Sequence, residues 1–201
     1  MKREPSPPLI PQEHRRRLLA VARRAICEHV RQGRLPESAP PHQPGERRGA
    51  FVTLHLGGRL RGCIGRTDSP DPLETLVALC AVLAATRDPR FPPIQLHELD
   101  ALEIELSILA PSVAVPPADV LARLEIGVHG VAITLGGARG LLLPQVAPEH
   151  GWNPQRLLEE TCRKAGLPPH AWRDPEVRIE LFTAEVFSEA QYPARPAQAA
   201  G

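Results

Sequence analysis

The first of two Gly-Gly pairs constrains this chain more than any other feature. Gly57-Gly58 separates an apolar run over residues 50–56 from a second strand-like run over residues 59–64. Tight two-residue turns between antiparallel strands need positive φ angles, which glycine adopts without steric cost. The pattern therefore predicts a β-hairpin over residues 50–64.

The second strand of this hairpin ends in the hexapeptide Leu-Arg-Gly-Cys-Ile-Gly, residues 60–65. Glycine within a strand marks a bulge, a bend or a close backbone approach, and Gly62 and Gly65 flank Cys63. A neighbouring guanidinium lowers the pKa of a thiol and makes it a better nucleophile, so Arg61 makes this cysteine a candidate for chemistry. The alternative is a small buried cysteine on which a helix packs. A bulge at Gly62 would decide whether Arg61 shares its face.

Length and composition exclude several classes of protein. The 201 residues suit one domain, or one domain with a small lobe, and the net charge of +1 gives no bulk attraction to nucleic acid. Aromatic residues make up only 3%, which disfavours a base-stacking platform. No run of about 18 apolar residues could span a membrane, and no secretory signal pattern is present. We therefore expect a cytoplasmic protein without a membrane partner.

Four cysteines occur, at positions 27, 63, 80 and 162, and none forms a C-x-x-C pair. This spacing predicts neither a zinc ribbon nor a thioredoxin-type motif. The sequence does not identify a cofactor, and this question stays open.

Periodicity predicts an α+β fold with a mostly antiparallel sheet and flanking helices. Residues 1–10 are proline-rich and predict a flexible arm, residues 11–190 a single domain, and residues 191–201 a disordered tail. The expected order is a helix over 11–33, the hairpin over 50–64, a buried helix over 73–86, a strand over 102–108, a short helix over 118–124, a hairpin over 127–143 turned by a second Gly-Gly pair, a helix over 153–166, and a last strand over 177–187.

The chain resembles the AMMECR protein family. The hexapeptide looks like the signature of that family, and further segments agree in the same order: Asp88–Pro93, Gly127–Gly130, and Leu143–Ala147 followed by Glu149 and Trp152. The resemblance implies the same α+β class, with a larger lobe and a smaller lobe that we place at residues 112–150. It also implies an association with Memo-type and radical S-adenosylmethionine (radical SAM) proteins.

Three residues together could form a nucleophile, a base and its orienting group: Cys63, His129 and Glu149. No spacing in the sequence forces them together, and a histidine between strand residues is more often structural. The same three side chains would suit a zinc or iron site, but we favour a metal-free pocket. The predicted ligand-binding residues are Arg61, Gly62, Gly65, Asp88, Arg90 and Gln145. For Asp88 and Arg90 the alternative is a structural ion pair.

Two functions follow, and the sequence leaves open whether the chain is an enzyme. In the first, the chain is a component of a modification pathway alongside Memo-type and radical SAM proteins, with a pocket around the hexapeptide for a small molecule or a nucleobase. In the second, it is a non-catalytic protein-binding module whose hexapeptide loop is a recognition surface.

Overall fold

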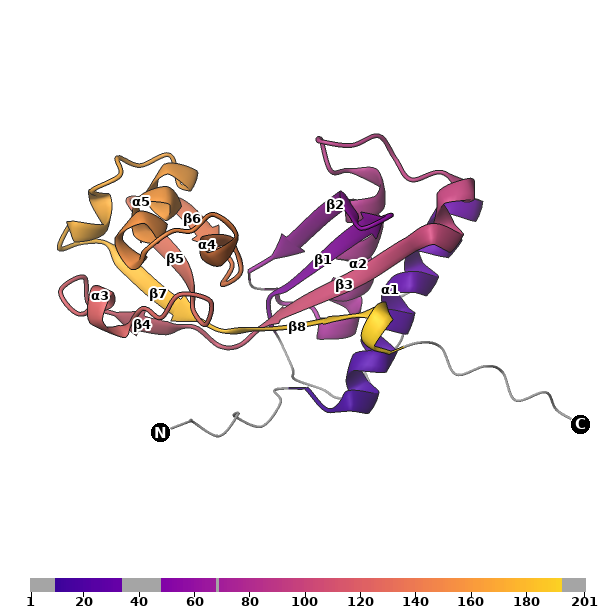
Figure 1. Ribbon diagram of the computed structural model, residues 1–201, viewed down its shortest axis with the longest axis horizontal. Helices are drawn as coiled ribbons and strands as arrows, with labels where there is room; N and C mark the ends of the chain where they lie inside the picture. Colours follow the sequence, from indigo (N-terminus) through magenta and orange to yellow (C-terminus); the bar gives the residue numbers. More distant parts are fainter. Residues whose placement is uncertain (1–9, 34–47, 68, 193–201) are drawn as a thin grey trace, which may run out of the picture. The chain divides into compact units, whose positions relative to one another are not determined.

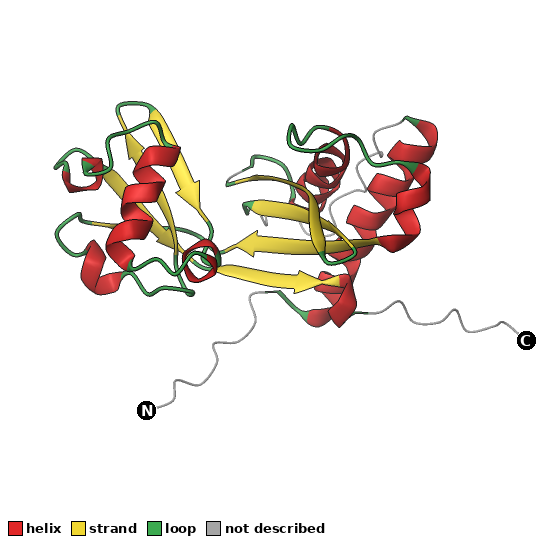
Figure 2. Ribbon diagram, turned by 45° about the horizontal axis from the view of Figure 1, so that its top comes forward, coloured by secondary structure: helices red, strands yellow, loops and turns green. Residues whose placement is uncertain are grey.

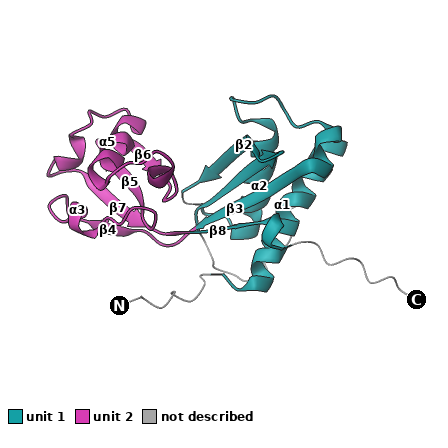
Figure 3. Ribbon diagram, in the orientation of Figure 1, with its two compact units in different colours: residues 1–108, 185–201 teal, residues 109–184 magenta. Residues whose placement is uncertain are grey.

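The computed structural model describes residues 10–33, 48–67 and 69–192. Contacts divide the chain into two compact units: residues 1–108 with 185–201 form unit 1, and residues 109–184 form unit 2 (Figure 3). Unit 2 includes the segment predicted for the smaller lobe and continues beyond it to residue 184. The predicted arm and tail lie almost entirely outside the described residues, although Ile10 is described and is completely buried.

Unit 1 is built on a four-stranded sheet in the order β2-β1-β3-β8, with β1 antiparallel to both β2 and β3 (Figure 1). Its elements are α1 (Gln12–Gln32), β1 (Ala50–Leu56), β2 (Arg59–Arg66), α2 (Leu73–Thr86), the 3-10 helix η1 (Leu96–Ala101), β3 (Leu102–Leu109), β8 (Ala184–Ser188) and the 3-10 helix η3 (Glu189–Gln191).

The core of unit 1 lies between one face of this sheet and α2. On β1, Ala50, Val52 and Leu54 are buried and alternate with half-buried residues, so one face of the strand is apolar. Helix α2 is apolar nearly all round and packs on β1 and β2, while α1 packs along α2 (Figure 2). The other face of the sheet, opposite α2, is called the outer face below.

Unit 2 has its own four-stranded sheet in the order β4-β7-β5-β6, in which the neighbouring strands are antiparallel. Helix α5 packs on β5 and β6 and completes a separate apolar core. The elements are β4 (Val113–Val115), α3 (Val120–Arg123), β5 (Gly130–Leu135), β6 (Ala138–Leu142), α4 (Val146–Glu149), α5 (Pro154–Lys164), the 3-10 helix η2 (Ala171–Arg173) and β7 (Arg178–Phe182).

Both units use a glycine in the second strand of a hairpin to bring a helix close. A Cβ atom on Gly62 would lie 2.3 Å from the Ala84 carbonyl oxygen of α2. A Cβ atom on Gly140 of β6 would lie 2.5 Å from the Thr161 carbonyl oxygen of α5. Real Cβ atoms cannot approach backbone so closely, so each glycine sets the distance between its helix and its strand.

The α+β class and the antiparallel habit are confirmed, whereas the predicted last strand is two strands. The run over residues 177–187 breaks at Thr183: β7 pairs with β4 and β5 in unit 2, and β8 joins β3 in unit 1. Alternation of apolar and polar residues predicts an extended segment but does not show which strands it pairs with. The sequence pattern therefore could not show that this segment passes from one sheet to the other. The predicted strand from residue 127 begins only at Gly130, because Gly127 has a φ angle of 81° and turns the chain.

None of the helices within the described ranges is both long enough and apolar enough to cross a membrane.

The start of α5 provides a stability prediction for unit 2. The side chain of Asn153 accepts a hydrogen bond from the Arg156 amide at 2.8 Å, and Pro154 follows it as the first helical residue. Asn153→Ala is expected to lower the free energy of unfolding by about 1 kcal/mol, because a helix-end amide loses its acceptor. Urea denaturation measures this loss. Asn153→Asp keeps the acceptor and should stay near wild type; equal losses in both variants would contradict the capping role.

Candidate functional site

A β-bulge at Arg61 shapes the candidate site in unit 1. In a regular two-residue hairpin Thr53 would pair with Gly62, but the register shifts between Leu54 and His55 and leaves Arg61 without a partner on β1. Thr53 consequently pairs with Cys63. The bulge therefore decides which side chains share the outer face with the thiol.

The side chain of Arg61 contacts the segment over residues 92–98. Its guanidinium forms a two-pronged ion pair with Glu98, with N–O distances of 2.8 and 3.0 Å, and donates to the Pro92 carbonyl at 2.7 Å. Hydrogen bonding from Arg61 lowers the pKa of the Glu98 carboxyl. The Glu98 carboxylate also accepts from the Gln95 amide that precedes η1. Arg61 thus joins β2 to η1, and we assign it a positioning role.

Asp88 connects the thiol-bearing strand to the loop that follows α2. Its Oδ2 atom accepts the Cys63 amide at 2.8 Å, and its two oxygens accept from the Arg90 side chain at 2.7 and 3.0 Å. Strand β2 lies at the edge of its sheet, so this carboxylate satisfies an amide that has no strand partner. The Arg90 guanidinium holds the pKa of the buried Asp88 carboxyl well below its usual range.

Cys63 lies on the outer face beside the hydroxyl of Thr53 on the neighbouring strand β1. Its half-buried Sγ atom accepts a hydrogen bond from Thr53 Oγ1 at 3.3 Å, and Glu105 of β3 is the cross-strand partner of Thr53. The hydrogen bond that the half-exposed Arg90 guanidinium donates to Asp88 raises the Arg90 pKa most, and the nearby Cys63 raises it by a smaller amount. This arrangement provides the thiol with a donor and a nearby cation.

The two buried cysteines lie in the cores, as the sequence predicted for them. Cys80 of α2 and Cys162 of α5 are completely buried. Burial raises the pKa of the Cys80 thiol to about 11, and burial also raises the pKa of the Cys162 thiol. Because the thiolate is the reactive form, neither is a candidate nucleophile. Cys27 of α1 is half-buried and packs against the core of unit 1.

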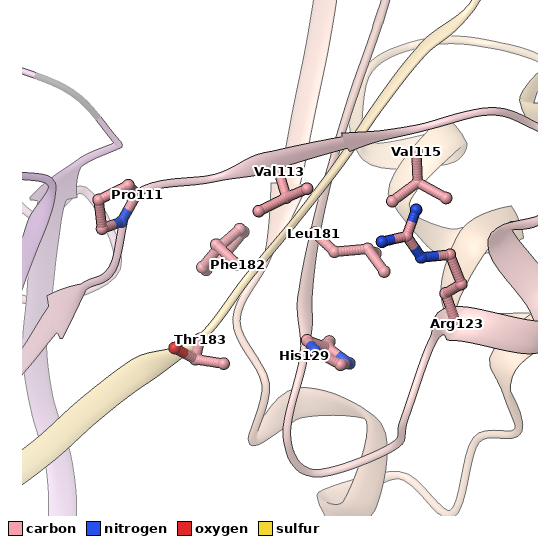
Figure 4. Close-up of a pocket in the computed structure, with 8 residues that line it drawn as sticks. All are labelled: Pro111, Val113, Val115, Arg123, His129, Leu181, Phe182 and Thr183. Atoms are coloured by element: carbon pink, nitrogen blue, oxygen red, sulfur yellow. The ribbon is translucent and has the colours of Figure 1, made fainter. Parts of the chain in front are cut away.

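His129 lies in unit 2 and faces a cavity of its own (Figure 4). Its Nδ1 atom accepts the Glu125 amide at 3.1 Å, and its backbone amide donates to the Glu125 carbonyl at 3.0 Å. A neutral ring that accepts at Nδ1 carries its proton on Nε2 and is a donor there. The lining residues of the cavity are Pro111, Val113, Val115, Arg123, His129, Leu181, Phe182 and Thr183.

The other predicted site residues of unit 2 are Gln145, which immediately precedes α4, and Glu149, which ends it. Glu149 is exposed at the end of this helix and is not among the cavity-lining residues. The side-chain oxygen of Gln145 is buried, and no described residue hydrogen-bonds to it. In the part of the chain that the structure describes, no three His, Cys, Asp or Glu side chains lie close enough together to hold a metal ion.

The structure therefore gathers one part of the predicted site in unit 1. A hydrogen-bonded cluster there contains Cys63, Asp88 and Arg90, with Arg61 and Gly62 beside it, whereas His129, Gln145 and Glu149 belong to unit 2. Two residues that the sequence analysis missed are Thr53 and Glu98. A regular two-residue turn at Gly57-Gly58 would pair Thr53 with Gly62, and only the bulge pairs it with the thiol.

The comparison with known proteins agrees with this architecture. The model of the AMMECR1 family matches residues 19–187, which is most of the chain. The chain belongs to the AMMECR1 family. The match covers elements of both units, so the AMMECR1 domain includes the cysteine cluster and the His129 cavity.

Archaeal AMMECR1 relatives are similar over nearly their whole length. A protein of Methanothermobacter thermautotrophicus is 46% identical, over 87% of this chain and 93% of the relative. Protein TK0174 of Thermococcus kodakarensis is 43% identical, over 89% and 91%. The crystal structure of the uncharacterized protein PH0010 from Pyrococcus horikoshii superposes with a TM-score of 0.81 at 39% identity, over 89% of this chain and 93% of that one. The AMMECR1 resemblance noted in the sequence is thereby confirmed.

Proposed function

We propose that this AMMECR1-domain protein is a component of a modification pathway, and that the outer face around Cys63 binds its small-molecule or nucleobase substrate. The observation that carries the proposal is the environment of the thiol. Cys63 is half-buried, accepts a hydrogen bond from Thr53, and belongs to a cluster whose backbone is fixed by Asp88. A positioned thiol with an adjacent donor and cation is suited to attack an electrophilic carbon of a bound substrate.

The same proposal includes two partner proteins. The family resemblance implies that the chain works alongside a Memo-type protein and a radical SAM protein. In this proposal the AMMECR1 chain binds or transfers the group on which those proteins act. Copurification of the three proteins from a common expression host tests this part separately from the chemistry of the thiol.

The thiol part is tested by the rate at which iodoacetamide alkylates each cysteine of the native protein, followed by mass spectrometry at neutral pH. We expect Cys63 to react first, Cys27 more slowly, and the buried Cys80 and Cys162 only after unfolding. Thr53→Val removes the hydroxyl that donates to Sγ and should slow alkylation of Cys63 by about three- to tenfold, the worth of one hydrogen bond.

A matched variant separates this effect from a general change in the protein. Thr134→Val removes a strand hydroxyl from unit 2 and should leave the Cys63 rate unchanged. If Cys63 resists alkylation until the protein unfolds, the thiol is a packing residue and the catalytic proposal fails.

A second candidate function is a non-catalytic binding module, and one feature of the surface favours it. Leu60 of β2 is 40% exposed and Leu96 of η1 is 60% exposed, and the Arg61–Glu98 ion pair connects their two elements. Exposed leucines on rigidly joined elements suit a partner protein. Under this function Leu60→Ser with Leu96→Ser would abolish copurification of the partners, whereas Cys63→Ser would leave it unchanged.

A further inference from the structure

The cavity lies within unit 2 and differs in chemical character from the cysteine cluster of unit 1. Its volume is about 310 Å³, and every residue that lines it belongs to unit 2. The apolar walls come from neighbouring strands, since Val113 of β4 is the cross-strand partner of Leu181 of β7. Such a volume, with mostly apolar walls and few polar groups, is typical of a small-molecule site.

A glycine fixes one wall of the cavity. A Cβ atom on Gly130 would lie 2.3 Å from the ring of Phe182, its cross-strand partner. The ring of Phe182 is only 3% exposed and can lie there because position 130 has no side chain. The residue before this glycine is His129, so the same turn positions an aromatic wall and a polar group.

Arg123 and His129 are donors in the cavity, and the third polar side chain, Thr183, has a hydroxyl that can donate or accept. Arg123, at the end of α3, points back toward Val115 and Leu181 (Figure 4). His129 donates through Nε2, because its Nδ1 atom accepts the Glu125 amide. None of the eight lining residues is acidic, and within the described ranges no carboxylate forms an ion pair with Arg123. Two donors, one of them permanently charged, therefore face an apolar space.

We propose that this cavity binds a small organic carboxylate with an apolar body. The planar guanidinium of Arg123 matches the two oxygens of a carboxylate, and His129 can donate to one of them. The apolar side chains of Val113, Leu181 and Phe182 would enclose the body of the ligand. The site is independent of the function proposed for Cys63.

The test uses the full chain and 3-phenylpropanoate as the probe, with binding followed by NMR shifts of the valine, leucine and phenylalanine signals. We expect shifts at Val113, Val115 and Leu181 and a dissociation constant of about 1 mM or tighter. Two analogues separate the contributions of the charge and of the apolar body to binding. The first, 3-phenylpropanamide, has the apolar body without the charge, and the second, inorganic phosphate, has a negative charge without the apolar body. Both should bind at least about tenfold more weakly, because each forgoes one of the two contributions.

Two pairs of variants link binding to the cavity. Arg123→Gln should weaken binding about tenfold or more, whereas Arg173→Gln removes an exposed arginine of the same unit outside the cavity and should have no effect. Val113 is 56% exposed, so Val113→Trp can fill the cavity without disturbing the core and should abolish binding. Leu121→Trp, on a residue outside the lining set, is its control.

Several outcomes would overturn the carboxylate site. Equal affinity for 3-phenylpropanoate and 3-phenylpropanamide would show that the negative charge does not contribute to binding. Tighter binding of phosphate than of 3-phenylpropanoate would show that the site binds a different anion. Unchanged affinity in Arg123→Gln, or shifts confined to residues outside the cavity, would place the ligand elsewhere. Absence of any shift up to about 10 mM probe would show that the cavity is not a carboxylate site.

Discussion

Gly62→Ala is expected to lower the free energy of unfolding by about 3 kcal/mol, because the new Cβ atom has no room in a well-packed interface. It would lie 2.3 Å from the Ala84 carbonyl oxygen and 3.2 Å from the carbonyl carbon. Both atoms belong to the backbone of α2, so relief requires the helix to move away from β2 rather than a side chain to rotate. Urea denaturation of the full chain measures the loss.

A matched substitution on the same hairpin separates this clash from the loss of a glycine as such. Gly58 has a φ angle of 74°, and a Cβ atom there meets nothing within 4 Å. Asparagine tolerates that backbone conformation, so Gly58→Asn should cost roughly 1 kcal/mol or less. Gly140→Ala, in unit 2, should resemble Gly62→Ala, since its Cβ atom would lie 2.5 Å from the backbone of α5. If Gly62→Ala costs no more than Gly58→Asn, the close approach of α2 to β2 is not what requires glycine.

Asp88→Asn is expected to lower the free energy of unfolding by about 2 kcal/mol at neutral pH. The carboxylate of Asp88 accepts the backbone amides of Cys63 and Arg90 and pairs with the Arg90 guanidinium, and it is only 4% exposed. An amide at this position has one acceptor oxygen and directs its NH2 group at donors. The cost stays moderate because the Arg90 side chain is half-exposed and can be solvated.

The pH dependence of this difference identifies the charge as its cause. The Arg90 hydrogen bonds lower the pKa of Asp88 in the folded state, so the carboxylate stabilises the fold above the unfolded pKa of about 3.9. That contribution is lost as the pH falls below about 4 toward the lower folded pKa, because the unfolded chain takes up the proton first.

The gap in stability between wild type and Asp88→Asn should therefore narrow progressively as the pH falls below about 4. Urea denaturation at about pH 7 and about pH 3 measures the gap between them. Asp119→Asn, at an exposed carboxylate of unit 2, should change stability by less than about 0.5 kcal/mol at either pH. A gap between wild type and Asp88→Asn that stayed constant across this range would mean that packing, not charge, is what Asp88 contributes.

The elements of this fold were predictable where one local signal dominates. Helix α2 runs from Leu73 to Thr86 as its apolar run indicated, and both Gly-Gly pairs turn hairpins. These features depend on contacts between residues close in the chain, so backbone freedom at glycine and side-chain periodicity are sufficient to find them. The hexapeptide was conspicuous for the same reason, since glycine within a strand needs a physical cause.

The candidate site was predictable only in part. Cys63, Asp88 and Arg90 were proposed from the sequence and do lie together, but the sequence allowed an ion pair and a pocket equally. The sequence left open whether Arg61 shares a face with the thiol; in the structure its side chain pairs with Glu98, which the bulge and the distant η1 together make possible. Thr53 escaped notice since the register of a regular hairpin places it opposite Gly62.

The sequence by itself determined the hairpins, the buried helices, the α+β class and the family to which the chain belongs, because each depends on local pattern or on motifs in order. Tertiary structure alone decided three things: the division of the last apolar run between two sheets, the bulge that pairs Thr53 with Cys63, and the cavity between β4, β7 and His129. All three depend on which distant segments pair, and pairing is chosen by the packing of whole sheets and helices rather than by any one segment.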